Sequence, residues 1–218
     1  MKKKQNLVRL VLFALFSALI VAMTFTPYMG YITVGIIEIT TLHIVVIIGA
    51  TILGAKYGAF LGGIWGITCI VRAVQMGFIP FVNPVVSLLP RILVGLVAAL
   101  VFIGLSKTKL SKIVSLVLAA LAGTVTNTTC VLSALKLCDD VKIVYGDIHL
   151  VLGKTDLLIK AGELSFNGFE ALFGNGAKTI EVIVGTIIGT NGIIELVAAL
   201  ILVPSIYMAT HKIIKNKI

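Results

Sequence analysis

Polar and charged side chains interrupt the apolar runs of this sequence at a few positions, and the chemistry that they offer is ligand binding. The candidates to contact a ligand are Arg72, Gln75, Asn83, Ser87, Arg91, Thr41, His43 and Asn191. Buried polar groups are costly in a bilayer, and they usually mark the site or path of a ligand or ion. The set therefore predicts a ligand site or path, in which the arginines could hold an anion.

The two arginines carry the most specific expectation. Arg91 follows Pro90, which predicts a position near the start of a helix, where its guanidinium and free backbone N–H groups together could hold an anion. Arg72 could act in the same way or pair with Glu195. Two plainer interpretations stay open: both arginines could extend to lipid phosphates, and His43 could be a hydrogen-bonded core residue. The tryptophan and the tyrosines could be interface anchors as easily as pocket walls.

Motifs for catalysis are not found. The stretch "LGKTD" at 152–156 carries the end of a phosphate-binding loop, but Ile148 occupies the position where that loop requires glycine. The sequence has no Ser-His-Asp arrangement, no HExxH and no paired-carboxylate site. Cys69, Cys130 and Cys138 are scattered, without histidines at metal-ligand spacing. The expectation is therefore no enzyme, no metal and no cofactor, with the cysteines in packing roles.

The elements that must position these residues are membrane helices. The chain has 218 residues, of which 59% are hydrophobic and 12% charged, and the mean hydropathy is +1.13. This is more apolar surface than a soluble core of that size can bury. The prediction is a single integral membrane domain over 1–218, an all-α bundle of six transmembrane helices at about 8–28, 37–55, 57–76, 85–105, 112–136 and 180–209. The insert at about 139–178 is too polar to span and is expected outside the cell.

Basic residues orient this bundle, because lysine and arginine near helix ends stay on the cytoplasmic side. They gather before the first span, between the second and third, between the fourth and fifth, and after the sixth, as Lys2, Lys3, Lys4, Arg9, Lys56, Lys107, Lys109, Lys112, Lys212, Lys215 and Lys217. These segments fall on one side only if there are six spans, which predicts that both termini are cytoplasmic. The net charge of +9 is thereby explained by topology, and nucleic acid is not an expected partner.

Small residues recur at intervals of four. Gly54, Gly58, Gly62 and Gly66 form one such series, Gly185 and Gly189 a second, and Ala14, Ala18 and Ala22 a third. This spacing lets helix backbones approach closely in lipid. Packing inside the bundle is expected for the glycines. For the alanine stripe of the first helix, packing inside the chain and contact with a second membrane protein are equally open.

Two tracts of the sequence resemble a known family. "TTLHIVVIIGATILGAKYGAFLGGIWGITCIVRA" and "FVNPVVSLLPRILVGLVAALVF" are similar to the substrate-binding S components of energy-coupling factor (ECF) vitamin transporters, and "NPVVSLLPRILVG" to the pantothenate-type branch. The resemblance implies a multi-pass protein of the cell membrane that binds a vitamin near the outer face. It also implies partners, namely a scaffold transmembrane subunit, contacted by Ala14, Ala18 and Ala22, and two ATPase subunits.

Pantothenate is the first choice of ligand within this family. Its carboxylate suits Arg72 and Arg91, and its hydroxyls and amide suit the polar candidates. Riboflavin, folate and cobalamin remain alternatives, although an aromatic content of 7% argues weakly against recognition by stacking. Outside the family, the rivals are a non-transport membrane assembly protein, an intramembrane enzyme with an unrecognised site, and a secondary transporter, for which no internal repeat is visible.

Overall fold

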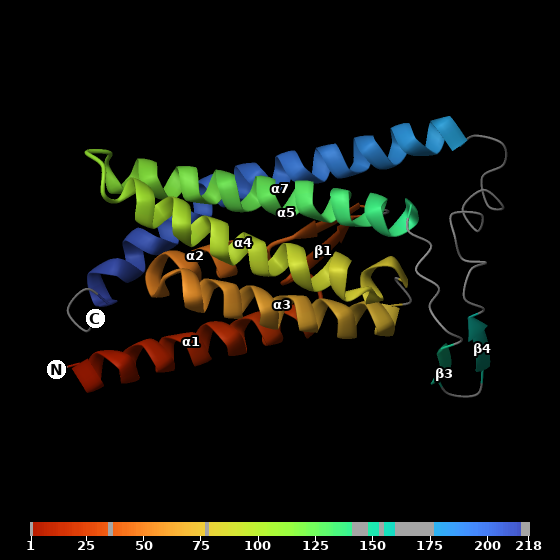
Figure 1. Ribbon diagram of the computed structural model, residues 1–218, viewed down its shortest axis with the longest axis horizontal. Coiled ribbons are helices and arrows are strands. Elements are labelled where there is room, and N and C mark those ends of the chain that lie inside the picture. Colours follow the sequence, from red (N-terminus) through yellow and green to blue (C-terminus); the bar gives the residue numbers. More distant parts are fainter. Residues whose placement is uncertain are drawn as a thin grey trace.

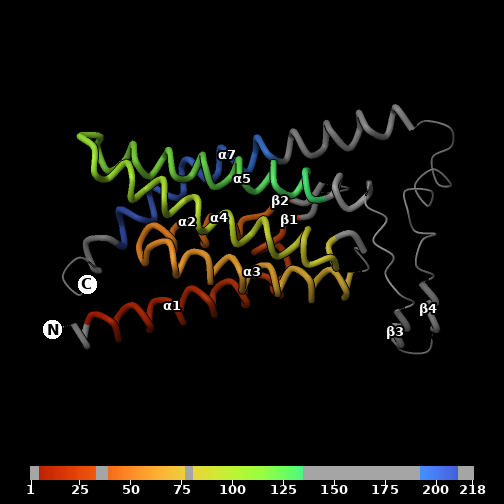
Figure 2. The backbone as a smooth tube through the Cα atoms, viewed as in Figure 1, coloured from red at the N-terminus to blue at the C-terminus, as the bar shows by residue number. Residues whose placement is uncertain are grey.

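A computed structural model describes the main chain of residues 2–34, 37–76, 79–140, 148–152, 155–159 and 177–214, and the side chains within 5–32, 39–76, 81–134 and 192–210. Figures 1 and 2 trace the chain. Its helices are α1 (Lys2–Phe25), α2 (Leu42–Leu53), α3 (Ala55–Met76), the short η1 (Ile79–Val82), α4 (Pro84–Leu105), α5 (Lys112–Asp140) and α7 (Ala177–Ile214). Two antiparallel hairpins join them, formed by β1 (Tyr31–Val34) with β2 (Ile37–Thr40) and by β3 (Ile148–Leu152) with β4 (Thr155–Ile159).

The predicted helical bundle is confirmed, with one change of architecture. In the described part of the chain, five helices are long and apolar enough to cross a membrane, and they occupy Gln5–Phe25, Ala55–Met76, Pro84–Leu105, Lys112–Ala134 and Gly192–Thr210. The expected second span at 37–55 is instead strand β2 followed by the 12-residue helix α2. Hydropathy does not distinguish a strand from a helix, whereas the β-branched residues at 32–34, 37, 39 and 40 favour strands.

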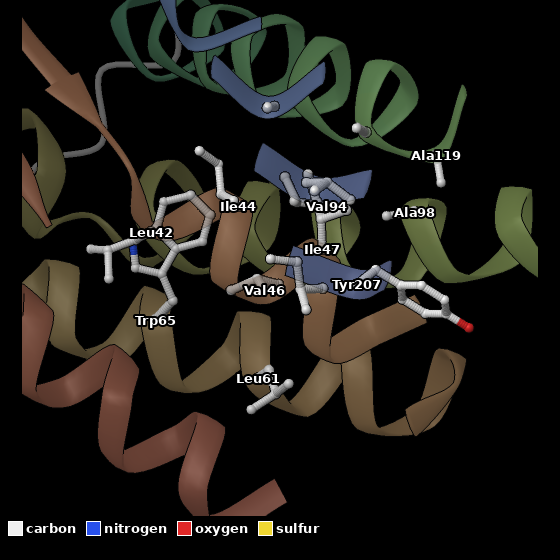
Figure 3. Packing of buried hydrophobic residues seen from close by; sticks show 14 of the residues in the cluster. Leu42, Ile44, Val46, Ile47, Leu61, Trp65, Val94, Ala98, Ala119 and Tyr207 are labelled. Atoms are coloured by element: carbon white, nitrogen blue, oxygen red, sulfur yellow. The ribbon is translucent and has the colours of Figure 1, made fainter. Parts of the chain in front are cut away.

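Helix α2 lies at the centre of the bundle, in contact with α1, α3, α4, α5 and α7. Nearly all its side chains are buried, which is the pattern of a helix that is apolar on every face. Figure 3 shows Leu42, Ile44 and Ile47 of this helix among side chains of its neighbours, including Trp65 and Val94. At its end Gly54 takes a φ of +95°, a conformation that glycine adopts without steric cost and that turns the chain into α3.

Glycines set the contact between α3 and α4, which is the most extensive helix pair in the described structure. Gly58, Gly62 and Gly66 lie directly against the main chain of α4. The prediction that they pack inside the bundle is therefore confirmed. Gly54 forms the turn described above, and the packing of Gly185 and Gly189 lies outside the described residues.

The ends of the bundle differ in character. Helix α1 begins and α7 ends at one end, where the α4–α5 turn also lies, whereas the β1–β2 hairpin and η1 lie toward the other (Figure 1). The cytoplasmic location of both termini stays a prediction. Within the insert predicted at about 139–178, the structure describes the end of α5, the β3–β4 hairpin and the start of α7, and the rest lies outside the described residues.

Candidate functional site

Helix α4 begins at Pro84, within one residue of the predicted span at 85–105, so Arg91 lies two turns inside the helix and not near its start. Asn83 is the N-cap, with its side-chain oxygen accepting a hydrogen bond of 2.9 Å from the Val85 backbone N–H, and Pro84 is the first residue of the helix. This pairing is a strong start signal. Pro90 and Arg91 consequently lie inside the helix, and the expectation of free N–H groups beside Arg91 was wrong.

Pro90 gives Arg91 a different anchor. A proline at this position cannot donate to the carbonyl four residues earlier, so the Val86 carbonyl is left without its helical partner. Arg91 Nη1 donates to that oxygen at 2.7 Å. The proline thus creates the acceptor that holds one side of the guanidinium.

The rest of the Arg91 side chain is enclosed by aromatic rings. Its guanidinium carbon lies 5.2 Å from the centre of the Trp65 ring and 5.7 Å from that of Phe81. The residue is only 5% exposed, and its Nε has no hydrogen-bond partner among the described residues. A buried guanidinium with an unpaired donor does not extend to lipid phosphates; it is arranged to receive an acceptor.

A second cation lies beside the same aromatic group. The guanidinium of Arg72 lies over the Tyr31 ring, 4.0 Å from its centre, and the indole Nε1 of Trp65 donates to the Tyr31 hydroxyl at 3.3 Å. Burial raises the pKa of that hydroxyl above its ordinary value. Strand β1 and helices α3 and α4 therefore form one positively charged, aromatic wall.

Unpaired polar groups face the interior from α2 and α5. Both ring nitrogens of His43, Thr124 Oγ1 and Asn127 Oδ1 are buried without a hydrogen-bond partner in the described structure. The two helices meet where a Cβ at Gly123 would lie 2.8 Å from Ile47. His43 and Asn127 each lie one helical turn from that contact, toward the hairpin end. Such groups cost free energy when they are unpaired, and a polar ligand would satisfy them.

Glu195 closes the cluster from α7. This residue is 6% exposed, and its Oε1 accepts a hydrogen bond of 2.7 Å from the backbone N–H of Thr40 at the end of β2. Arg91 lies near enough to interact electrostatically with both Glu195 and Tyr31. The carboxylate thus fixes the hairpin to the bundle beside the arginine.

The other predicted site residues have different surroundings. The Ser87 hydroxyl donates to the Phe81 carbonyl and so fixes η1, and the Thr41 hydroxyl donates to the Met29 carbonyl at 2.6 Å. Asn83 caps α4. Gln75 is exposed near the end of α3, and the side chain of Asn191 lies outside the described residues.

Residues 8–207 match the family described as "ECF transporter, substrate-specific component". The chain belongs to this family. It is accordingly a multi-pass protein of the cell membrane, in a family whose members are transporter components and not enzymes.

Two relatives of this S component carry a transport name. The "Pantothenate transporter PanT" of Leuconostoc mesenteroides is 37% identical over 101 residues, which are 43% of this chain and 50% of the relative. The "Pantothenic acid transporter PanT" of Lactococcus lactis is 29% identical over 234 aligned positions, covering 98% of this chain and 99% of the relative. The chain therefore spans half the length of the first relative and nearly all of the second.

The alanine stripe of this S component points away from its own bundle. Ala14, Ala18 and Ala22 are all exposed, whereas the opposite side of α1 carries the buried Ile20 and Thr24. Thr24 and Thr68 of α3 join their hydroxyls at 3.2 Å. Of the two interpretations of the stripe, packing inside the chain is thus wrong, and an outward-facing surface remains.

Several residues of the polar cluster escape prediction from sequence. Phe81, Thr124 and Asn127 were not predicted, whereas the tryptophan and the tyrosines were considered as pocket walls or interface anchors and Glu195 as a possible partner of Arg72. A signal existed for two of them, because Thr124 and Asn127 stand three residues apart on an apolar helix and so share a face. The others come together only through the tertiary fold.

Proposed function

We propose that this S component binds pantothenate in the buried polar cluster and passes it into the cell with energy from separate subunits. The observation that carries the proposal is the set of unpaired buried atoms on Arg91, His43, Thr124 and Asn127 in the described structure. Folded proteins pair nearly all such atoms, so several of them in the described structure favour a bound ligand. The names of the two relatives support pantothenate as that ligand.

The chemistry of pantothenate suits the two sides of the cluster. Its carboxylate would accept from the Arg91 guanidinium, with Arg72 adding positive charge nearby, since charge-assisted pairs of this kind are strong. Its amide and hydroxyls would reach the polar groups of α2 and α5. The aromatic rings of Trp65 and Phe81 exclude water from the carboxylate, which strengthens its attraction to the arginine.

Transport would depend on partners. The sequence carries no phosphate-binding loop that fits the pattern, so ATP hydrolysis is assigned to two ATPase subunits. The exposed stripe of Ala14, Ala18 and Ala22 offers a smooth face on which a scaffold transmembrane subunit can pack closely. In this arrangement α2 counts as the sixth membrane element, both termini are cytoplasmic, and the hairpin end opens outside.

Uptake into liposomes tests this function. The S component is reconstituted with its scaffold and ATPase subunits, and entry of radiolabelled pantothenate is followed with ATP inside the vesicles. We expect uptake that needs both ATP and every subunit. Uptake of riboflavin, folate or cobalamin instead would correct the ligand. Uptake driven by an ion gradient without the ATPases would contradict the mechanism, and no uptake of any vitamin would favour an assembly protein.

A further inference from the structure

Helices α3 and α4 pack in a regular antiparallel register. A Cβ built at Gly58 would lie 2.6 Å from the Gly95 carbonyl oxygen, and one at Gly66 would lie 2.7 Å from Leu88 Cα. Between these contacts, a Cβ at Gly62 would lie 2.0 Å from the Arg91 carbonyl oxygen and 2.6 Å from the Arg91 carbonyl carbon. The three contacts follow one another at intervals of one helical turn. The middle contact is with Arg91, the proposed anchor of the ligand's carboxylate.

The contact at Gly62 leaves no room for adjustment. The atoms that would be struck belong to the main chain of α4, which cannot swing aside as a flexible side chain can. Any side chain at this position must therefore push α4 away from α3. The neighbouring Gly63 differs, because a Cβ there would meet only Ile92 Cγ1 at 3.8 Å, an ordinary contact.

Separation of the two helices would displace Arg91 in particular. Its guanidinium lies near the ring of Trp65, which belongs to α3, and near that of Phe81, which precedes α4. The proline-created acceptor at Val86 moves with α4, whereas the indole moves with α3. A change in helix spacing thus alters the position of the guanidinium relative to the Trp65 ring.

We propose that Gly62 is a positioning residue for ligand recognition: its missing side chain sets the helix spacing at which Arg91 meets the carboxylate of the ligand. This inference rests on the proposed function. Binding groups must be held within about 0.5 Å of their productive geometry, and a clash with main-chain atoms exceeds that tolerance. We expect the largest effect on the carboxylate, because Gly62 touches the main chain of Arg91 itself.

The test compares Gly62→Ala with the matched control Gly63→Ala in purified protein. Calorimetry measures the affinity for pantothenate and for its alcohol analogue, in which a hydroxymethyl group replaces the carboxylate. We expect Gly62→Ala to weaken pantothenate binding by roughly tenfold to hundredfold, the range for loss of a charge-assisted hydrogen bond. Binding of the alcohol should change by less than about threefold, and Gly63→Ala should leave both within about twofold.

The ratio of the two affinities separates positioning from general damage. A loosened fold weakens both ligands and leaves the ratio unchanged, so an unchanged ratio in folded Gly62→Ala overturns the proposal. If that variant does not fold, Gly66→Ala makes the same comparison, since its contact includes the Ser87 carbonyl oxygen at 3.0 Å. A change in the ratio supports the proposal in either variant, and an unchanged ratio overturns it.

Tryptophan fluorescence of the protein without ligand tests the role of Gly62 independently of the proposed function. Trp65 is the only tryptophan of the chain, so its fluorescence reports on the neighbouring guanidinium. The emission of Gly62→Ala should shift from that of the wild type, while that of Gly63→Ala should not. If the wild type binds no pantothenate, the proposed function fails, and the emission alone decides whether Gly62 positions Arg91.

Discussion

Replacing Arg91 with glutamine should weaken pantothenate binding by roughly tenfold to 150-fold. In the structure, Nη1 of this residue is used by the Val86 carbonyl, whereas Nε is unpaired and enclosed. At least one hydrogen bond to the carboxylate is therefore available. Such a bond to a charged group contributes about 1.5–3 kcal/mol, and each 1.4 kcal/mol corresponds to about a tenfold change in affinity.

Glutamine is chosen over alanine because its amide can still donate to the Val86 carbonyl. The substitution then removes the charge without leaving that carbonyl unpaired, and the thermal midpoint of the empty protein should change little. Isothermal titration in detergent measures the affinity for pantothenate and for its alcohol analogue. Arg9→Gln serves as the control, because Arg9 is an exposed arginine near the start of α1.

The decisive comparison is between the two ligands. We expect Arg91→Gln to bind pantothenate and the alcohol with similar, weak affinity, and Arg9→Gln to behave as the wild type. If Arg91→Gln retains full affinity for pantothenate, the carboxylate is held elsewhere and the assignment of the anchor is wrong. If both ligands weaken equally, the arginine acts through the fold and not through charge.

Three further predictions concern the other parts of the account. Asn127→Leu should weaken pantothenate binding by roughly twofold to tenfold, as calorimetry would measure. Thermal unfolding should find the empty protein at least as stable as the wild type, since the substitution removes an unpaired buried oxygen. A large loss of stability would indicate a structural role for Asn127. Glu195→Leu should speed hydrogen exchange at the Thr40 backbone N–H, because that group loses its acceptor. Glu195→Gln keeps an acceptor and should leave the exchange rate unchanged. Equal exchange rates in the two variants would contradict this hydrogen bond. Ala18→Trp should abolish both co-purification with the scaffold subunit and uptake, without changing the affinity for the ligand. Leu100→Trp, at an exposed site on α4, should leave co-purification and uptake intact. Normal assembly of Ala18→Trp would refute the assignment of the alanine stripe as the partner surface.

Periodicity and composition predict much of the fold. The five long helices follow from apolar length, and the packing of Gly58, Gly62 and Gly66 inside the bundle follows from their spacing, because both are properties of single segments. The prediction of a second membrane span at 37–55 is wrong for a related reason. A hydropathy window registers the isoleucines of β2 and the apolar residues of α2 as one run, although the strand is held by its pairing with β1.

The candidate site is less predictable, since its members come from seven separate elements, namely β1, α2, α3, η1, α4, α5 and α7. Arg91 is found because a buried arginine is costly wherever it lies, but its contact with Trp65 depends on how α3 packs against α4. The expectation that Pro90 places Arg91 near a helix start was wrong, because Asn83 followed by Pro84 is the stronger start signal and agrees with the predicted span at 85–105. Asn127 required knowledge of which face of α5 is buried, which apolar content alone does not give.

The identity and stoichiometry of the small molecule bound by the wild-type protein test the proposed pantothenate binding most directly. The chain is purified in mild detergent after growth with pantothenate, and native mass spectrometry records the complex before the ligand is extracted and identified. We predict one pantothenate per chain, displaced by neither riboflavin nor folate nor cobalamin. A protein that binds no pantothenate when saturated with it would contradict the central claim.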